Sequence, residues 1–493
     1  MQLFNTLGKR KEVFEPLVPG KVGLYACGVT VYDDVHLGHA RSAVVFEVLV
    51  RYLRWRGLTV TWVRNYTDID DKILKRAAEE GAPWEEVARR YIVSFQEDMA
   101  ALGIPPAQIE PKATEHIPEM LEIIARLMDK GFAYQRPAGG DVYFRVRRFP
   151  DYGKLSGQSL EDLEAGARVE VDELKEDPLD FVLWKASKPG EPAWPSPWGP
   201  GRPGWHIECS AMSMKYLGET LDIHGGGRDL VFPHHENELA QSEAANAKPF
   251  ARFWVHHGLL TIDKEKMSKS LGNFFTVKEV LGRFPAEVVR FFLINAHYRS
   301  PLDFSDAALE EAETALLRLY STLARIDELT AGRPAPPAAA PPGFAPAALS
   351  PEERERLAAL RDRFQAALDD DLNTAQALGY LFDAVRLANR LLEAPETDPA
   401  YLAFLSRLSA EIRELGQVLN LLQDDPAAMV ARLRQKTADL ALTPEEIEAL
   451  IARRTAARQS KDFATADAIR RELDEKGIVL EDTPKGTIWR VKG

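Results

Sequence analysis

The sequence predicts an α/β fold: a parallel-sheet domain with an insertion, then a helical bundle, then a small C-terminal α+β domain. Three observations lead to this prediction. A strand, a loop, a helix and a second strand follow one another near the N-terminus, which is how a parallel sheet begins. Strand patterns return beyond a Pro- and Trp-rich stretch. After Pro301 the apolar residues recur mainly at helical spacing.

The first half of the sheet domain is predicted over residues 1–110. Residues 22–26 form a short apolar run and residues 59–64 are β-branched and aromatic, as in buried strands. Residues 40–55, which lie between them, carry apolar side chains at helical spacing. A β-loop-α-β unit of this kind is typical of sheets that bind nucleotides.

Changes in pattern set the other boundaries. Residues 111–203 are predicted as an insertion with short strands at 141–146 and 181–185. The second half of the sheet domain follows over 204–255, with strands at 220–224 and 253–261, and a loop region covers 256–301. The bundle is predicted over 302–425, including an exposed loop at 331–351 with seven prolines in 21 residues. Residues 441–493 are predicted to form two helices and a hairpin.

Composition narrows the class of protein. The 493 residues are 45% hydrophobic and 28% charged, which is ordinary for a globular protein. The net charge of -13 argues against non-specific coating of nucleic acid, so any nucleic acid must meet local basic patches. Two cysteines, Cys27 and Cys209, make no disulfide framework and favour a reducing compartment. With neither a signal-peptide pattern nor a long apolar stretch, we expect a soluble cytoplasmic protein with no membrane partner.

A first motif, HLGH, contains His36, Gly38 and His39 at the predicted junction of strand and helix. Helix N-termini attract phosphate, and Gly38 removes a Cβ that would keep a nucleotide away from the backbone. Two imidazoles beside that point can donate hydrogen bonds to phosphoryl oxygens. The alternative is a chance occurrence of a short motif.

A second motif, KMSKS, places Lys266, Ser268 and Lys269 in one loop. Lysine is a compact charge suited to polyphosphate. The alternative is a solvated basic turn. The occurrence of both motifs in this order makes a nucleotide site the better interpretation.

A third group of residues points to a metal. His234 and Glu238 are four residues apart on a predicted helix and therefore share one face. Together with Cys27 and Cys209 they could complete a zinc site. The alternatives are inert buried thiols and a solvated helix start.

A fourth motif is the glycine run 225–227, preceded by a predicted strand. Backbone without side chains can lie flat against a planar ligand such as adenine, and Asp229 could meet the ribose or the base. The alternative is a flexible turn.

The C-terminal residues 441–493 hold ten basic and ten acidic residues, so they are relatively basic for this chain, and Trp489 and Arg490 lie near the end. An aromatic ring beside arginine suits unstacked RNA bases. The alternative is an ordinary helix pair with a hairpin.

HLGH followed by KMSKS resembles the class I aminoacyl-tRNA synthetases. Longer segments are similar to cysteinyl-tRNA synthetases, and the similarity runs from Phe4 to Trp489; the segments include YACGVTVYDDVHLGHAR, PGWHIECSAM, DIHGGGRDLVFPHHENELAQS and DKEKMSKSLGNFFTV. The resemblance implies a Rossmann-like catalytic domain in two halves, a stem-contact region at 256–301 and an anticodon-binding domain at 441–493.

The resemblance also implies an activity: a cysteine–tRNA ligase that uses L-cysteine, ATP with Mg²⁺ and tRNA(Cys), as a monomer with one Zn²⁺. It implies catalytic roles for His36, His39, Lys266 and Lys269. It further implies ATP binding by these four and by Gly38, Gly225, Gly226, Gly227, Asp229 and Ser268; cysteine binding by Thr67, Trp205 and His224; zinc binding by Cys27, Cys209, His234 and Glu238; and anticodon contacts by Trp489 and Arg490. For Trp205 and Thr67 the alternative is core packing.

Two rival functions remain from the sequence. A cysteine ligase of mycothiol biosynthesis shares the catalytic half but has no comparable anticodon-binding end, so residues 441–493 argue against it. A catalytically silent RNA-binding paralogue would not need intact HLGH and KMSKS motifs.

Overall fold

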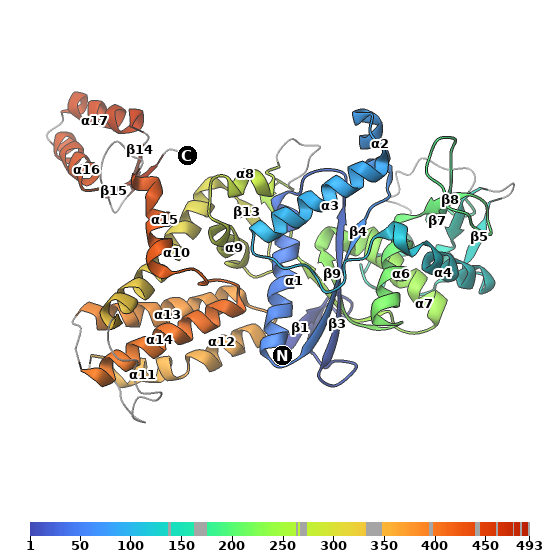
Figure 1. Ribbon diagram of the computed structural model, residues 1–493, viewed down its shortest axis with the longest axis horizontal. Coiled ribbons are helices and arrows are strands. Elements are labelled where there is room, and N and C mark those ends of the chain that lie inside the picture. Colours follow the sequence, from blue (N-terminus) through green and yellow to red (C-terminus); the bar gives the residue numbers. More distant parts are fainter. Residues whose placement is uncertain are drawn as a thin grey trace. The chain divides into compact units, whose positions relative to one another are not determined.

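The computed structural model describes residues 1–136, 140–161, 175–262, 265–266, 274–331, 348–393, 398–438, 444–459, 462–476, 478–483 and 486–491. Two compact units make up the chain. The first comprises residues 1–304, 355–383 and 414–421, and the second comprises 305–354, 384–413 and 422–493 (Figure 1). The predicted α/β class is confirmed, while the domain boundaries drawn from the sequence remain predictions.

A four-stranded parallel sheet lies at the centre of the first unit. Its order is β10 (Ala251–His257), β9 (Leu221–Gly227), β3 (Lys21–Thr30) and β4 (Thr59–Thr67). The chain therefore runs from β3 outward to β4 and later from β9 outward in the other direction. This reversal opens a crevice beyond the carboxyl ends of β3 and β9, where such sheets bind ligands.

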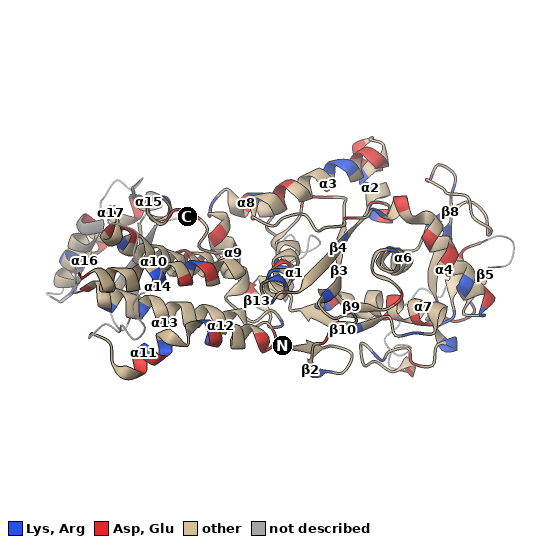
Figure 2. Ribbon diagram, turned by 60° about the horizontal axis from the view of Figure 1, so that its bottom comes forward, with Lys and Arg blue, Asp and Glu red and all other residues tan. Residues whose placement is uncertain are grey.

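Helices cover this sheet. Helix α1 (Leu37–Trp55) connects β3 to β4 and begins at His36, as the HLGH motif predicts. The other helices near the sheet are α2 (Asp71–Glu80), α3 (Trp84–Ala101), α4 (Ile117–Asp129), α6 (Trp205–Leu217) and α7 (Glu236–Asn246). Acidic and basic residues alternate along α2 and α3 (Figure 2), as expected for solvent-facing helices.

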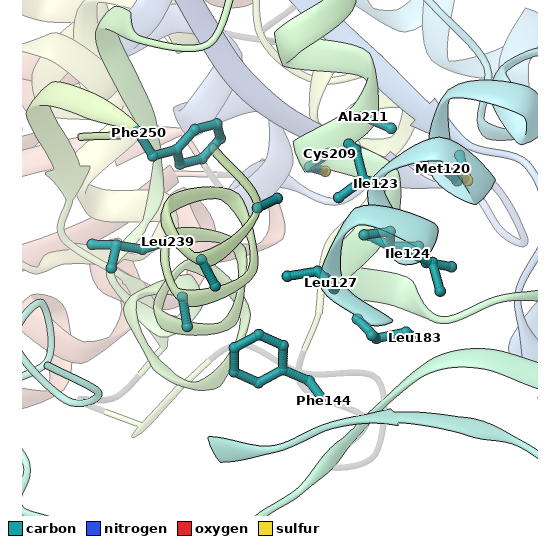
Figure 3. Close-up of a cluster of buried hydrophobic side chains, with 14 of the residues drawn as sticks. Met120, Ile123, Ile124, Leu127, Phe144, Leu183, Cys209, Ala211, Leu239 and Phe250 are labelled. Atoms are coloured by element: carbon teal, nitrogen blue, oxygen red, sulfur yellow. The ribbon is translucent and has the colours of Figure 1, made fainter. Parts of the chain in front are cut away.

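The insertion forms an antiparallel sheet of β5 (Ala133–Gln135), β6 (Val142–Phe144), β7 (Phe181–Ala186) and β8 (Gly201–Pro203). It shares a hydrophobic core with the parallel-sheet region. Figure 3 shows Ile124 and Leu127 of α4 beside Leu183 and Phe144 of the insertion, whereas Leu239 projects from the far side of α7; all five belong to one buried cluster. This shared core fixes α6 and α7, which carry two of the predicted metal ligands, Cys209 and Glu238.

Several elements differ from the sequence prediction. The strand expected at 253–261 is two strands in different sheets, because β10 ends at His257 and β11 (Leu260–Ile262) pairs with β12 (Glu265–Lys266) and β13 (Leu302–Phe304). Gly258 separates them, and its backbone lies so close to Ser300 that a Cβ would be 2.3 Å from the Ser300 carbonyl oxygen. The hairpin of β1 (Gln2–Asn5) and β2 (Arg10–Val13) was not predicted.

The predicted helices after residue 301 are confirmed. They are preceded by α8 (Val277–Leu281) and α9 (Ala286–Ile294), and comprise α10 (Asp306–Thr330), α11 (Pro351–Ala358), α12 (Leu360–Asp369), α13 (Thr374–Glu393), α14 (Pro399–Val418) and α15 (Pro426–Ala438). Residues 355–383 and 414–421 of the predicted bundle belong to the first unit. Most of the proline-rich segment, residues 332–347, lies outside the described residues.

The C-terminal part has the predicted α+β elements. Helices α16 (Pro444–Gln459) and α17 (Phe463–Glu475) pack with the hairpin of β14 (Ile478–Thr483) and β15 (Gly486–Val491) around Ile447, Leu473 and Ile478. Across the described part of the chain, none of the helices has the length and apolar character needed to span a membrane.

Candidate functional site

A cavity of about 570 Å³ lies in the first unit, at the carboxyl ends of β3 and β9. Residues 26–30 of β3 and the start of α1 form one side of the cavity. The other residues that line it include Trp205, Gly227, Asp229 and His257. The crevice expected from the strand order is therefore a real cavity, and it contains the HLGH motif.

The two histidines of HLGH cap the helix that they begin. The backbone N–H of Gly38 donates to Nδ1 of His36 at 3.1 Å, and the backbone N–H of His36 donates to Nδ1 of His39 at 3.3 Å. Their rings stack with centroids 3.8 Å apart. Because each Nδ1 accepts a hydrogen bond, each neutral ring carries its proton on Nε2 and can donate it to an anion.

Gly38 is required by this arrangement. A Cβ at residue 38 would lie 2.8 Å from Cε1 of His36, closer than real contacts allow. The stacked histidines thus explain the glycine within the protein itself, and a close approach of nucleotide to this backbone remains a prediction.

The KMSKS motif is only partly described. Lys266 ends the short strand β12, and its side chain is not described. Ser268 and Lys269 fall in residues 267–273, outside the described residues. The chain beyond them is bonded to the HLGH loop: Leu37 N–H donates to the Phe275 carbonyl at 3.1 Å, and Val277 N–H to the Val35 carbonyl at 3.0 Å.

The glycine run lies inside strand β9, so the alternative of a flexible turn is wrong. All three glycines are buried. A Cβ at Gly225 would lie 2.4 Å from Cζ of Phe46, so packing against α1 requires that glycine. Gly227 and Asp229 line the cavity, whereas Gly225 and Gly226 are not among its lining residues.

The four predicted metal ligands meet beside this cavity. Cys27 Sγ lies 3.8 Å from Cys209 Sγ and 3.5 Å from Oε1 of Glu238. His234 Nε2 lies 2.9 Å from the same Glu238 oxygen. All four side chains are buried, so the alternative of a solvated helix start is wrong. Thiols, an imidazole and a carboxylate are zinc ligands, and the donor set therefore fits zinc.

Charges in this cluster are strongly perturbed. The hydrogen bond from Cys27 lowers the pKa of the Cys209 thiol to about 6, whereas burial raises the pKa of Cys27 well above its usual value. Burial opposes the charge on Glu238 and on His234. The neighbouring His224 and His234 nevertheless lower the pKa of Glu238, and the attraction of Glu238 raises the pKa of His234 to about 10. Glu238 is thus held as a carboxylate and the lowered pKa of Cys209 favours its thiolate, the forms in which both groups bind a metal, whereas Cys27 and His234 have to lose a proton to act as ligands.

His235 is a further member that the sequence analysis passed over. Its Nε2 lies 3.2 Å from Cys27 Sγ, and together with Cys27, His234 and Glu238 it forms a group that could hold a metal ion. His257 also lines the cavity and was not predicted. The sequence held a signal for both residues. His235 directly follows the predicted ligand His234, and His257 lies at the carboxyl end of a strand, where the cavity opens.

The three predicted cysteine-binding residues occupy different positions. Trp205 is 39% exposed, lines the cavity and stacks on His234 at 4.1 Å, so core packing is wrong for it. His224 is buried at the metal cluster, with Nε2 3.1 Å from Oε2 of Glu238. Thr67 is buried and donates its hydroxyl to Glu208 at 2.8 Å, a contact that fits the packing alternative.

The predicted anticodon residues lie in the C-terminal hairpin. Trp489 of β15 pairs with Leu480 of β14, and Arg490 with Val479. Their side chains are outside what the structure describes.

Comparison with known proteins identifies the family. Residues 13–314 match the tRNA synthetases class I (C) catalytic domain, residues 363–423 the DALR domain, and residues 441–490 the cysteinyl-tRNA ligase anticodon binding domain. Cysteine–tRNA ligases of Geobacter metallireducens and Geobacter sulfurreducens are each 57% identical to the chain and covered over their full length, as is this chain. A solved structure of Mycobacterium tuberculosis methionyl-tRNA synthetase with methionyl-adenylate shares the fold, with a TM-score of 0.62, 17% identity, and coverage of 84% of this chain and 96% of that one.

A parallel sheet with HLGH at its crevice, together with the matched catalytic domain, defines a class I aminoacyl-tRNA synthetase. Within that class, the full-length identity and the matched anticodon domain show that the chain belongs to the cysteine–tRNA ligase family.

Proposed function

We propose that this chain is an active cysteine–tRNA ligase that reads its amino acid through zinc. The observation that carries the proposal is the double role of Cys27, which lines the cavity with His36 and His39 and also belongs to the Cys/His/Glu cluster. A ligand in the cavity therefore reaches both the phosphate-binding motif and the metal site.

In the first step, a carboxylate oxygen of cysteine forms a bond to the α-phosphorus of ATP. The bond from that phosphorus to the bridging oxygen breaks, and pyrophosphate leaves with Mg²⁺. This reaction depends on positioning and charge neutralisation more than on covalent help. His36 and His39 donate to the α-phosphoryl oxygens from Nε2, and Lys266 and Lys269 neutralise the departing pyrophosphate.

The remaining nucleotide contacts come from the cavity wall. Gly38 and Ser268 approach the phosphates, and Asp229 meets the ribose or the base. Of the glycines 225–227, Gly227 lies in the cavity wall and supplies the backbone under adenine.

Zinc would be held by Cys27, Cys209, His234 and Glu238. When bound it supplies a Lewis acid that takes the substrate sulfur as thiolate. Trp205, Thr67 and His224 bind the rest of the amino acid. The hydroxyl of serine stays protonated near neutral pH and is a poor zinc ligand. A hydrophobic pocket alone separates near-isosteric substrates by only about 10²-fold, so the selection against serine rests on the thiol chemistry.

In the second step, the cysteinyl group passes to the 3'-terminal adenosine of tRNA(Cys), and AMP leaves. Residues 256–301 contact the stem, and residues 441–493 read the anticodon through the hairpin that carries Trp489 and Arg490. The chain works in the cytoplasm as a monomer. Two buried free thiols suit a reducing compartment, and one chain supplies every residue of the site.

The test is cysteine-dependent exchange of pyrophosphate into ATP, followed by charging of tRNA(Cys). Exchange without charging, combined with ligation of an amino sugar, would identify the mycothiol-type ligase. A protein with no exchange at all would be the silent paralogue. We expect both exchange and charging, and His39→Ala should abolish both without loss of the folded state.

A further inference from the structure

Three segments meet at an ion pair just outside the cavity. Lys278, in α8, donates to Oδ1 of Asp34 at 2.8 Å and to Oγ of Ser94 at 2.7 Å. Ser94, in α3, donates to the same Asp34 oxygen at 2.6 Å. Asp34 belongs to the loop between β3 and α1. One ammonium group thus joins the loop that carries HLGH to two helices.

The same loop is also bonded through its backbone to the segment that precedes Lys278. His36 lies opposite Thr276 in a two-residue bridge. Its two hydrogen bonds, which join Leu37 to Phe275 and Val277 to Val35, flank His36 on both sides. Thr276 also starts α8 with a reciprocal capping box to Glu279, which fixes the direction in which Lys278 leaves the bridge.

These contacts leave little freedom for His36. Asp34 is two residues before it and is held by Lys278 and Ser94; Leu37 directly follows it and is held by Phe275. The direction of the His36 ring also depends on the bond from Gly38 to its Nδ1. A shift of Asp34 therefore moves the imidazole that faces the cavity.

Stability alone does not account for this ion pair. Lys278 is 47% and Asp34 38% exposed, and exposed pairs contribute little to folding. Its position beside the catalytic motif suggests a kinetic role, because small misplacements of a reacting group cost far more in rate than in stability.

We propose that Lys278 is a positioning residue for adenylate formation: it holds Asp34, with Ser94, so that His36 faces the phosphoryl group in its reactive orientation. This inference rests on the proposed function. Lys278 is not among the residues that line the cavity or form the metal cluster, so its effect falls on the rate of the phosphoryl step and not on cysteine binding.

The experiment measures cysteine-dependent pyrophosphate exchange in the full chain for Lys278→Met, Lys278→Arg and Asp34→Asn. We expect Lys278→Met to lower kcat by about 10-fold, with the KM for cysteine changed by less than about 2-fold. Lys278→Arg keeps a donor to both oxygens and should restore kcat to within about 3-fold of the parent. Asp34→Asn combined with Lys278→Met should be no slower than the slower single variant, because both remove the same contact.

Lys248→Met is the matched control. Lys248 forms an ion pair with Glu219 away from the cavity, and the two side chains are 59% and 45% exposed, which is similar to the exposure of Lys278 and Asp34. The kcat of this control variant should equal that of the parent. If the parent enzyme exchanges pyrophosphate and Lys278→Met matches Lys248→Met, the positioning role is refuted. It is also refuted if kcat, the KM for cysteine and the melting temperature all worsen together, or if Lys278→Arg gives no rescue. A parent without exchange would instead refute the proposed function.

Discussion

Asp98 offers a test of the electrostatics beside the HLGH loop. It lies on α3, is 3% exposed, and its Oδ2 has no hydrogen-bond partner within the described chain. Burial raises its pKa from 3.8 to about 6, Lys278 acts in the opposite direction, and Asp34 and Glu97 add to the increase. A carboxyl whose pKa is raised by folding stabilises the folded state while protonated, and this stabilisation is lost as the pH rises through 6.

The magnitude follows from that shift. The increase of the Asp98 pKa from 3.8 to about 6 costs the folded state at most about 3 kcal/mol once the carboxyl is fully ionised at pH 8. At pH 5 the cost is about half of that. Asp98→Asn is neutral at every pH. It should therefore raise the free energy of unfolding by up to about 3 kcal/mol at pH 8 and by clearly less at pH 5.

The assay is urea unfolding of the variant and the parent at pH 5 and pH 8, followed by tryptophan fluorescence. Glu86→Gln is the control, since Glu86 is exposed on the same helix and is not among the groups that shift the pKa of Asp98, so its removal should change stability little at either pH. An equal gain for Asp98→Asn at both pH values, or no gain at pH 8, would show that the buried charge is not the cause.

Three further predictions concern the activity itself. Lys269→Ala should slow adenylate formation by about 10²–10³, the scale of one lost transition-state charge contact, with cysteine affinity unchanged; pre-steady-state kinetics checks this, and an unchanged rate would contradict it. Removal of residues 441–493, whose hydrophobic core is a separate cluster, should leave pyrophosphate exchange largely intact and abolish tRNA charging; normal charging by the truncated, folded protein would refute the anticodon assignment. Cys209→Ser should weaken zinc binding at least 10-fold in a chelator competition and lower cysteine activation in parallel; unchanged zinc affinity would remove Cys209 from the ligand set.

Local patterns predicted much of the site because its motifs sit where elements begin and end. HLGH lies at a strand-to-helix junction, and both the apolar strand and the helical spacing after Gly38 are visible in sequence. His234 and Glu238 were placed on one helical face, and their side chains do meet at 2.9 Å, although α7 begins only at Glu236.

Contacts between distant segments could not be predicted in this way. The hydrogen bond from Thr67 to Glu208 and the ion pair of Lys278 with Asp34 depend on how strands and helices assemble. The residues next to them in the sequence do not indicate either contact. Gly225 is another example. Its sequence context indicated a ligand surface or a turn, whereas the structure shows a buried strand pressed against Phe46.

X-ray absorption at the zinc edge tests most directly whether the metal reads the substrate thiol. The zinc-loaded protein is measured alone, with cysteine and with serine. The proposed function predicts a further sulfur neighbour near ~2.3 Å with cysteine and an unchanged spectrum with serine. An unchanged spectrum with cysteine, together with full cysteine activation after zinc removal, would contradict it.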